Sequence, residues 1–255
     1  MSRKWVLITG GSGKVGQALV ERLLADGYAI AFTSLRPERR EIVLARFANA
    51  ATTGHLTGFS LNLEKDDGIT GLVDDLKRTG ISPYGIINNA RSRTNLVVDE
   101  SREPSRRQWV NEFLVNVVSA YELTTVIARQ SGSMLRTVVN VGSIYGVVAV
   151  NHGLYDDPSH IPPVHYGVCK AALIQTSREL AVRLAPLGVR VNTVSFGGVE
   201  GRTSDAFKQN YGRLCPHGRM LQEQDVAGPV SYLLSEGSSA QTGDNMVVDG
   251  GWVIW

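Results

Sequence analysis

The chain has little cysteine, little net charge and no long apolar run, and each shortage excludes a class of protein. Its two cysteines, Cys169 and Cys215, cannot form a disulfide framework and match no zinc spacing, which favours a reducing compartment and no metal. A net charge of +2 does not indicate binding to nucleic acid or to a membrane surface. No run is long enough to span a bilayer, and no signal-peptide pattern is present. We therefore expect a soluble cytoplasmic protein.

Short apolar runs alternate with longer amphipathic ones along all 255 residues. Several of the apolar runs are nearly continuous in Val, Ile, Leu and Ala, as in parallel strands that are buried on both faces. The predicted strands cover residues 5–9, 29–34, 55–63, 84–90, 137–142, 189–196 and 245–249. The predicted helices cover residues 15–26, 38–50, 66–78, 106–130, 166–184 and 223–235.

This alternation predicts a single α/β domain over residues 1–255 with a Rossmann-type, doubly wound, seven-stranded parallel sheet. Ligands of such sheets bind at the carboxyl ends of the strands, near the point where the strand order reverses. Two long segments, 146–164 and 197–220, show no regular pattern.

A glycine-rich turn lies between the first strand and the first helix. It reads Thr9-Gly10-Gly11-Ser12-Gly13-Lys14-Val15-Gly16. Glycines permit the tight turn and a close approach of a pyrophosphate, and the new helix presents free N–H groups to that anion. The turn predicts a dinucleotide site, although a tight turn without a ligand would look the same. Lys14 would either reach a phosphate or remain solvated.

The end of the second predicted strand indicates which dinucleotide binds. A carboxylate there would hydrogen-bond the ribose 2′-hydroxyl and repel a 2′-phosphate. The chain has Ser34 at this place, and Arg36, Arg39 and Arg40 follow. The missing negative charge and the nearby guanidinium groups favour NADP over NAD. The alternative is that these arginines only form an exposed helix start.

The run Tyr166-Gly167-Val168-Cys169-Lys170 is the strongest catalytic signal. Residues four apart on a helix share a face, and an ammonium beside a phenol favours the phenolate. Taken alone, the pair would be a surface tyrosine with a snorkelling lysine. Ser143 ends a strand at the ligand edge, where its hydroxyl could hold a substrate oxygen. Asn116 is a mediocre helix former inside a helix, which suggests a carbonyl or water contact, or simply a benign surface partner.

Together these motifs resemble the short-chain dehydrogenase/reductase family over nearly the whole chain. The matching positions, in family order, are Thr9–Gly16, Asn88-Asn89-Ala90, Asn116, Ser143, Tyr166, Lys170 and the tail Thr242-Gly243…Val248-Asp249-Gly250-Gly251. The resemblance implies that Tyr166 exchanges a proton with the substrate oxygen, which Ser143 polarises. It also implies that Lys170 binds the nicotinamide ribose and lowers the tyrosine pKa, and that Asn116 holds a water linked to Lys170.

The resemblance adds further cofactor contacts and shows some departures. Asn62, beside Leu63, stands where the family usually has an aspartate that contacts the adenine. Phe196 replaces a usual proline, while Val199 keeps a place near the nicotinamide. Lys14 takes the position of a family glycine, and this Gly-x-x-Gly-x-x-Gly spacing is similar to the sugar-nucleotide branch. The predicted cofactor contacts are Thr9, Gly10, Ser12, Gly13, Lys14, Val15, Gly16, Ser34, Arg36, Asn62, Leu63, Asn89, Ala90, Tyr166, Lys170 and Val199.

Two segments bear on the substrate. An insertion at about residues 147–164 lies between Ser143 and Tyr166, so it must be near the mouth of the site. Its many hydrogen-bonding groups favour a polyhydroxylated substrate, but a prolyl surface loop or a subunit contact is an equal alternative. By resemblance, residues at about 197–220 form a substrate lid. The predicted substrate contacts are Arg91, Ser143, Tyr155 and Tyr166.

Arginines near the site suggest a negative charge on the substrate. They are Arg91, Arg93, Arg202, Arg213 and Arg219. If they converged, they would suit a phosphate or a carboxylate, whereas ordinary exposed arginines would only be solvated.

The expected function is hydride transfer between a nicotinamide cofactor and a secondary alcohol or ketone, on a polar, sugar-like or anionic substrate. The insertion and the tail Asp249–Trp255 are similar to the PtmA-like flagellin-modification dehydrogenases. The alternatives are a sugar-nucleotide epimerase or dehydratase and a non-catalytic NAD(P)-binding regulatory protein. Resemblance also implies a homo-oligomer, a dimer or a tetramer.

Overall fold

Seven parallel strands form one continuous sheet in the computed structural model, which describes residues 3–92, 94–98, 103–201 and 203–255. The strands are β1 (Trp5–Ile8), β2 (Ala29–Ser34), β3 (Leu56–Ser60), β4 (Pro83–Asn88), β5 (Thr137–Ser143), β6 (Arg190–Phe196) and β7 (Asn245–Val248). Their order is β3-β2-β1-β4-β5-β6-β7. The doubly wound, seven-stranded parallel sheet expected from the sequence is confirmed.

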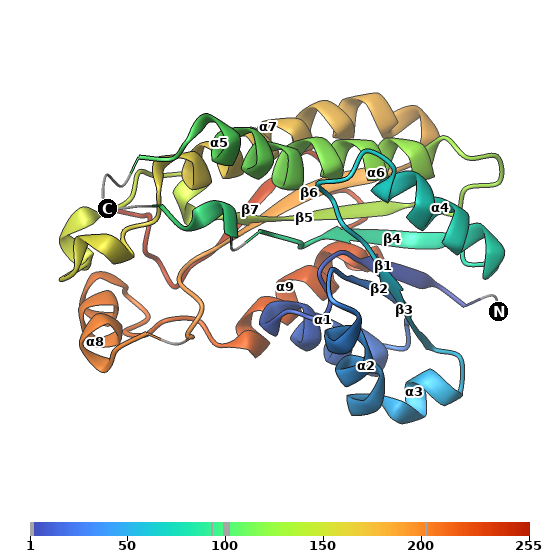
Figure 1. The fold of residues 1–255 in the computed structure, drawn as a ribbon, viewed down its shortest axis with the longest axis horizontal. Helices are drawn as coiled ribbons and strands as arrows, with labels where there is room; N and C mark the ends of the chain where they lie inside the picture. The colour runs from blue at the N-terminus through green and yellow to red at the C-terminus, as the bar shows by residue number, and fades with distance from the viewer. Residues whose placement is uncertain (1–2, 93, 99–102, 202) are drawn as a thin grey trace.

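Helices cover both faces of this sheet (Figure 1). One layer holds α4 (Gly68–Arg78), α5 (Arg106–Phe113), α6 (Ser119–Ala128) and α7 (Val164–Leu184). The other layer holds α1 (Lys14–Ala25), α2 (Pro37–Arg46), α3 (Ala48–Thr52) and α9 (Glu223–Leu234). None of the helices in the described part of the chain combines the length and the apolar character needed to cross a membrane.

The alternating side chains of the strands build two separate cores. Leu7 and Ile86 point to the layer of α4, α6 and α7, where they pack with Leu123. The next residue in each strand, Ile8 and Ile87, points to the layer of α1 and α9. Since successive residues of a strand face opposite sides, continuous apolar strands are what a sheet covered on both faces requires.

The strand order reverses between β1 and β4, and polar groups join the ends of these two strands. The hydroxyl of Thr9 accepts the N–H groups of Asn89 at 3.0 Å and Ala90 at 3.1 Å. The Asn89 amide donates to the carbonyl oxygens of Thr9 at 3.0 Å and Gly10 at 3.2 Å. The loops that follow β1 and β4 are therefore fixed to each other where the fold places its ligand crevice.

Three predicted segments differ from the structure. The helix predicted at 38–50 breaks at Phe47, whose φ of −112° and ψ of 42° are not helical, and so forms α2 and α3. The helix predicted at 106–130 is α5 and α6 joined by a π-helical turn, Leu114–Val118. The segment at 197–220, expected to be irregular, contains α8 (Asp205–Leu214), whose N-cap Ser204 accepts the N–H of Phe207 at 3.2 Å.

Shortening a fully buried core side chain tests the packing. Leu123 in α6 is completely buried, so Leu123→Ala should lower the free energy of unfolding by about 2–5 kcal/mol. Ile42→Ala on exposed α2 is the control and should change it by less than about 0.5 kcal/mol. Urea denaturation measures both values, and equal small effects would contradict the packing described here.

Candidate active site

The turn after β1 is shaped so that backbone, not side chains, faces the crevice. Gly10 has a φ of +66°, and a Cβ there would lie 2.9 Å from the Cα of Ala90. A Cβ on Gly16 would lie 2.5 Å from the carbonyl oxygen of Gly10. Helix α1 begins with Gly13 as its N-cap, and no side chain caps its first N–H groups. These free donors and the narrow glycine turn fit a pyrophosphate.

Ser12 of the turn contacts the end of β2. The hydroxyl oxygens of Ser12 and Ser34 lie 2.8 Å apart, and Ser34 Oγ also accepts the N–H of Arg36 at 3.3 Å. The guanidinium groups of Arg36 and Arg39 are exposed and take part in no hydrogen bond or ion pair with other described residues. Two uncommitted positive charges therefore stand beside a strand end that lacks a carboxylate.

Lys14 has partners that the sequence did not indicate. Its ammonium forms an ion pair with Glu223 at 2.7 Å and donates to the carbonyl oxygen of Glu200. Lys14 is thus neither free over the turn nor simply solvated, because it joins the turn to the start of α9. Val199, next to Glu200, forms an isolated parallel bridge with Leu221. Contact of Lys14 or Val199 with a cofactor stays a prediction.

Asn62 and Leu63 follow β3 and have different surroundings. The Asn62 side-chain oxygen accepts the N–H of Glu64 at 2.9 Å, which closes a local turn and leaves the amide N–H₂ group for another acceptor. Leu63 reaches a small cavity that Thr9, Ala90, Asn116 and Lys170 also line. The ends of β1, β3 and β4 therefore meet at one place.

Two glycines permit close packing between the segment after Ser143 and helix α7. Ser143 is the last residue of β5, and its hydroxyl accepts the N–H of Tyr145 at 3.2 Å. A Cβ on Gly146 would lie 2.7 Å from the backbone of Lys170, and one on Gly167 would lie 2.7 Å from the carbonyl oxygen of Tyr145. The segment after Ser143 therefore packs directly on the first turns of α7, which carry half-buried Tyr166.

Lys170 is buried beneath this contact. Its ammonium donates to the carbonyl oxygen of Val141 at 2.9 Å and lies 6.0 Å from the centre of the Tyr166 ring. Burial lowers the pKa of Lys170 to about 8, while the Glu112 carboxyl opposes that change and Arg91 adds to it. The ammonium is therefore buried near the Tyr166 ring, while its contact with a nicotinamide ribose stays a prediction.

Asn116 lies in the π-helical turn between α5 and α6. Its amide N–H₂ group donates to the backbone oxygen of Glu112 at 2.9 Å and to the Glu112 carboxyl at 2.8 Å. Its side-chain oxygen is buried and has no partner in the described protein. Asn116 and Lys170 line the same cavity of about 10 Å³, close to the space that one water molecule occupies.

The insertion is anchored by only a few of its residues. Its polar side chains mostly face solvent or close short turns, since Asn151 accepts the N–H of Gly153 and Asp157 that of Ser159. That its polar groups surround a substrate stays a prediction. Tyr155, the predicted substrate contact within the insertion, is half-buried.

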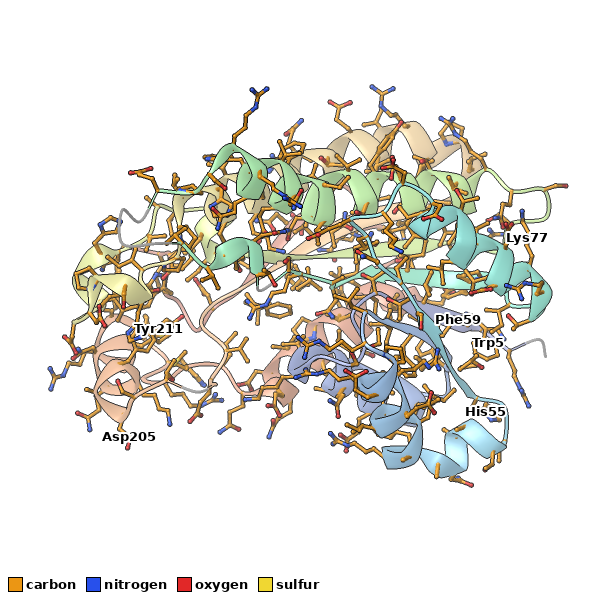
Figure 2. All side chains as sticks on the ribbon, in the orientation of Figure 1. Trp5, His55, Phe59, Lys77, Asp205 and Tyr211 are labelled. Atoms are coloured by element: carbon orange, nitrogen blue, oxygen red, sulfur yellow. The ribbon has the colours of Figure 1, made fainter. Side chains whose placement is uncertain are left out.

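Tyr155 connects the insertion to the segment after Ser143 and to α8. Its hydroxyl lies 2.9 Å from that of Tyr145, and its ring centre lies 5.2 Å from that of Phe207. Burial raises the pKa of both tyrosines. Tyr211, which Figure 2 labels on α8, stacks on Trp252 with ring centres 4.3 Å apart, and its hydroxyl accepts the N–H of Gly198 at 2.7 Å. The insertion, α8 and the C-terminal segment around Trp252 thus form one cluster of aromatic side chains, which lines the site.

Two positive side chains of the lid segment form ion pairs with carboxylates. Arg219 pairs with Asp225 at 2.7 Å, and Lys208 pairs with Glu200 at 3.0 Å. Arg91 is exposed after β4 and interacts electrostatically with both Glu112 and Lys170. Arg93 and Arg202 lie outside the described residues. In the described part of the chain, no group of His, Cys, Asp or Glu could hold a metal.

Four residues near the site were not predicted from the sequence. They are Glu112, Tyr145, His165 and Tyr211. Glu112 carried a readable signal, because it stands four residues before Asn116 and therefore on the same face of the helix. Tyr145 and His165 adjoin Ser143 and Tyr166 in the chain, but adjacency does not say where a side chain points.

Comparison with known proteins gives matches over nearly the whole chain. The family model described as enoyl-(acyl carrier protein) reductase matches residues 12–253. Post-translational flagellin modification protein A of Campylobacter coli is 23% identical over 99% of both chains. D-arabinitol 2-dehydrogenase of Candida tropicalis is 26% identical over 99% of this chain and 93% of that one. A short-chain dehydrogenase of Leptospira borgpetersenii, solved with NAD⁺, has a TM-score of 0.85 at 28% identity, covering 99% and 93% of the two chains.

A methyl group in the glycine turn tests whether the turn holds a dinucleotide. Gly16→Ala places a Cβ 2.5 Å from Gly10 O, so cofactor affinity should fall roughly tenfold or more, with a loss of about 1–3 kcal/mol of stability. Fluorescence titration with NADPH and NADH measures the affinity. Gly71→Ala in α4, where a Cβ meets nothing within 4 Å, is the control and should bind as the wild type does. Equal binding by Gly16→Ala would remove the turn from the site.

Proposed function

Because the chain belongs to the short-chain dehydrogenase/reductase family, we propose that it transfers a hydride between a nicotinamide cofactor and a secondary alcohol or ketone. The observation that carries this proposal is the packing of the segment after Ser143 on α7. That packing gathers Ser143, Tyr166 and Lys170 at the carboxyl edge of the sheet, beside the crevice between β1 and β4.

The residues along the crevice fit a dinucleotide. The turn from Thr9 to Gly16 would receive the pyrophosphate, the end of β2 the adenosine ribose, and Asn62 with Leu63 the adenine. Asn89, Ala90 and Val199 would flank the other half of the cofactor, and Tyr166 and Lys170 its ribose. When bound, the cofactor supplies or accepts the hydride.

The three catalytic side chains divide the remaining work. The Ser143 hydroxyl holds and polarises the substrate oxygen. The Tyr166 phenol gives its proton to that oxygen during reduction and takes it back during oxidation. The Lys170 ammonium, whose Nζ lies 6.0 Å from the centre of the Tyr166 ring, supplies a positive charge beside the reacting groups.

The charges at the end of β2 favour NADP as the cofactor. Arg36 and Arg39 are exposed and uncommitted within the described structure, whereas Arg40 pairs with Glu41 and donates to Ser60. Free guanidinium groups are the usual partners of a ribose 2′-phosphate. Ser34, in place of a carboxylate, avoids the repulsion that would exclude that phosphate.

The wall of the site supports a polar, sugar-like substrate. The hydroxyls of Tyr145 and Tyr155 are joined to each other and interact electrostatically with Tyr166, so they lie near the reacting position. Phenol rings with inward hydroxyls offer both an apolar face and hydrogen bonds. The likeness to D-arabinitol 2-dehydrogenase supports the same class, and Arg91 would accommodate an acidic group.

The outer faces of α5 and α7 support a homo-oligomer. Val110 and Phe113 of α5 are exposed by 57% and 40%, and Val164 and Val168 of α7 by 57% and 46%. The two helices pack side by side, so these side chains form one apolar surface that a second copy of the chain would cover.

Removing the phenol oxygen tests the catalytic assignment. Tyr166→Phe should lower kcat by about 10²–10⁴-fold while NADPH still binds, because only the proton donor is lost. Absorbance of the reduced nicotinamide reports turnover, and fluorescence reports binding. Unchanged turnover would contradict the role of Tyr166.

The same assay defines the substrate, using a panel of sugars, polyols, hydroxy acids and ketones. Net oxidation or reduction of the cofactor is expected with polyhydroxylated members. Product without net cofactor change would indicate an epimerase, and a response to lipophilic ketones alone would contradict the polar-substrate proposal.

Exchanging charges at the end of β2 tests cofactor preference. Arg36→Ala should raise KM for NADPH roughly tenfold and leave KM for NADH unchanged, because only NADPH carries the 2′-phosphate. Ser34→Asp should shift preference toward NADH. Arg40→Ala removes a committed arginine and should change the ratio of the two KM values much less. Equal weakening of both cofactors by Arg36→Ala would argue against NADP.

A further inference from the structure

A carboxyl group lies buried behind the proposed catalytic residues. Glu112 is the next-to-last residue of α5, and none of its surface is exposed. One carboxyl oxygen accepts the Asn116 amide at 2.8 Å, and the other has no partner in the described protein. Burying a carboxyl group is energetically costly unless hydrogen bonds or an opposite charge compensate it.

The contacts with Glu112 fix the orientation of the Asn116 side-chain amide. Its backbone oxygen and its carboxyl oxygen are both acceptors and both contact the same amide nitrogen. Only the N–H₂ end of Asn116 can satisfy two acceptors, so the Asn116 oxygen must take the opposite side. That unpartnered oxygen belongs to a residue that lines the small cavity together with Lys170.

Glu112 also interacts with charged and titratable groups on every element around it. Lys170, His165 and Cys169 face it from α7, and Arg91 from the loop after β4. Burial raises the pKa of Glu112, while Lys170, the Asn116 bond, His165 and Arg91 oppose the rise. The Glu112 carboxylate in turn raises the pKa of Lys170 against its burial.

His165 is the second buried group that the proposed chemistry does not use. Its Nε2 donates to the backbone oxygen of Asn95 at 2.8 Å, and its Nδ1 has no partner in the described protein. Its ring lies 5.7 Å from that of Trp109, one turn before Glu112 on α5. The contact between α5 and α7 therefore holds polar atoms from both helices around Glu112.

We propose that Glu112 is a positioning residue for the proton transfer, which orients the Asn116 amide in the cavity shared with Lys170 and acts on that ammonium through its charge. The proposal rests on the proposed function, since it concerns the side chains that serve Tyr166. It assigns Glu112 no contact with substrate or cofactor. A purely structural acid would support folding but would leave the protonation of Lys170 unchanged.

Three variants separate charge, position and fold. Glu112→Gln keeps the shape and removes the charge, and Glu112→Asp keeps the charge but withdraws it from Asn116. Glu122→Gln is the matched control, because it removes an exposed acid from the neighbouring helix α6. Circular dichroism and urea denaturation establish that each variant is folded.

The first readout is the pH dependence of kcat/KM. Without the Glu112 charge the Lys170 ammonium loses its proton more easily, so the alkaline limb in Glu112→Gln should move to lower pH by about one unit. Glu112→Asp should keep the limb within about 0.3 units of the wild type but lower kcat about tenfold, because Asn116 is no longer oriented. A limb in Glu112→Gln that superimposes on those of the wild type and Glu122→Gln would overturn the proposal.

The second readout needs neither cofactor nor turnover. A lysine-selective NMR titration of the cofactor-free protein, with the Lys170 signal assigned from Lys170→Met, should give a pKa of about 8 in the wild type. The value should be lower in Glu112→Gln and unchanged in Glu122→Gln. If it is the same in all three, Glu112 does not hold the charge of Lys170. Since this titration is independent of catalysis, it stands even if Tyr166→Phe shows that the proposed function is wrong.

Discussion

The buried ammonium of Lys170 is the interaction on which the rest of the site depends. Taking a cation out of water is costly, and the protein offsets the cost with the carbonyl oxygen of Val141, the carboxyl of Glu112 and the polar cavity beside Asn116. Each of these groups comes from a different element, so the charge can be held only when β5, α5 and α7 are correctly packed. The requirement links the fold of the sheet to the chemistry at its edge.

Small residues make that packing possible. Gly146 and Gly167 let the segment after Ser143 touch α7, and Gly10 and Gly16 let the turn after β1 touch its neighbours. A side chain at any of these places would push backbone apart. The molecule therefore keeps the proposed catalytic residues close to one another by having glycine where its segments meet.

The entrance of the site, beyond the edge of the sheet, differs in structure from the floor formed by the strand ends. The floor depends on backbone groups and buried hydrogen bonds, whereas the mouth is an aromatic cluster formed by the insertion, α8 and the C-terminal segment. Figure 1 shows α8 and the insertion together at one end of the molecule. Segments that are distant in sequence thus meet in one cluster of buried side chains.

The sequence predicts well those structural features that short-range residue patterns determine. All seven strands, the parallel order and the placement of Ser143 at a strand end follow from apolar runs and their alternation with helices. The break at Phe47 and helix α8 were missed, because one residue's backbone angles and a short capped helix leave weak periodicity. The partners of Lys14 were missed because Glu200 and Glu223 meet it only through tertiary packing.

The same limit applies to the insertion and the lid segment. Composition showed that the insertion and the lid are polar, but it could not show that Asp157 closes a turn or that Arg219 is already paired with Asp225. Glu112 was overlooked for the opposite reason, since a charged residue in an amphipathic helix is normally assigned to its solvent face. Its burial becomes apparent only once α5 is placed against α7.

A crystal structure with the reduced cofactor and a polyol or its ketone tests the central claim most directly. The account predicts the nicotinamide in the crevice between β1 and β4, and the substrate oxygen within hydrogen-bond distance of both the Ser143 hydroxyl and the Tyr166 phenol. A cofactor bound elsewhere, or a phenol turned away from the substrate oxygen, would contradict it.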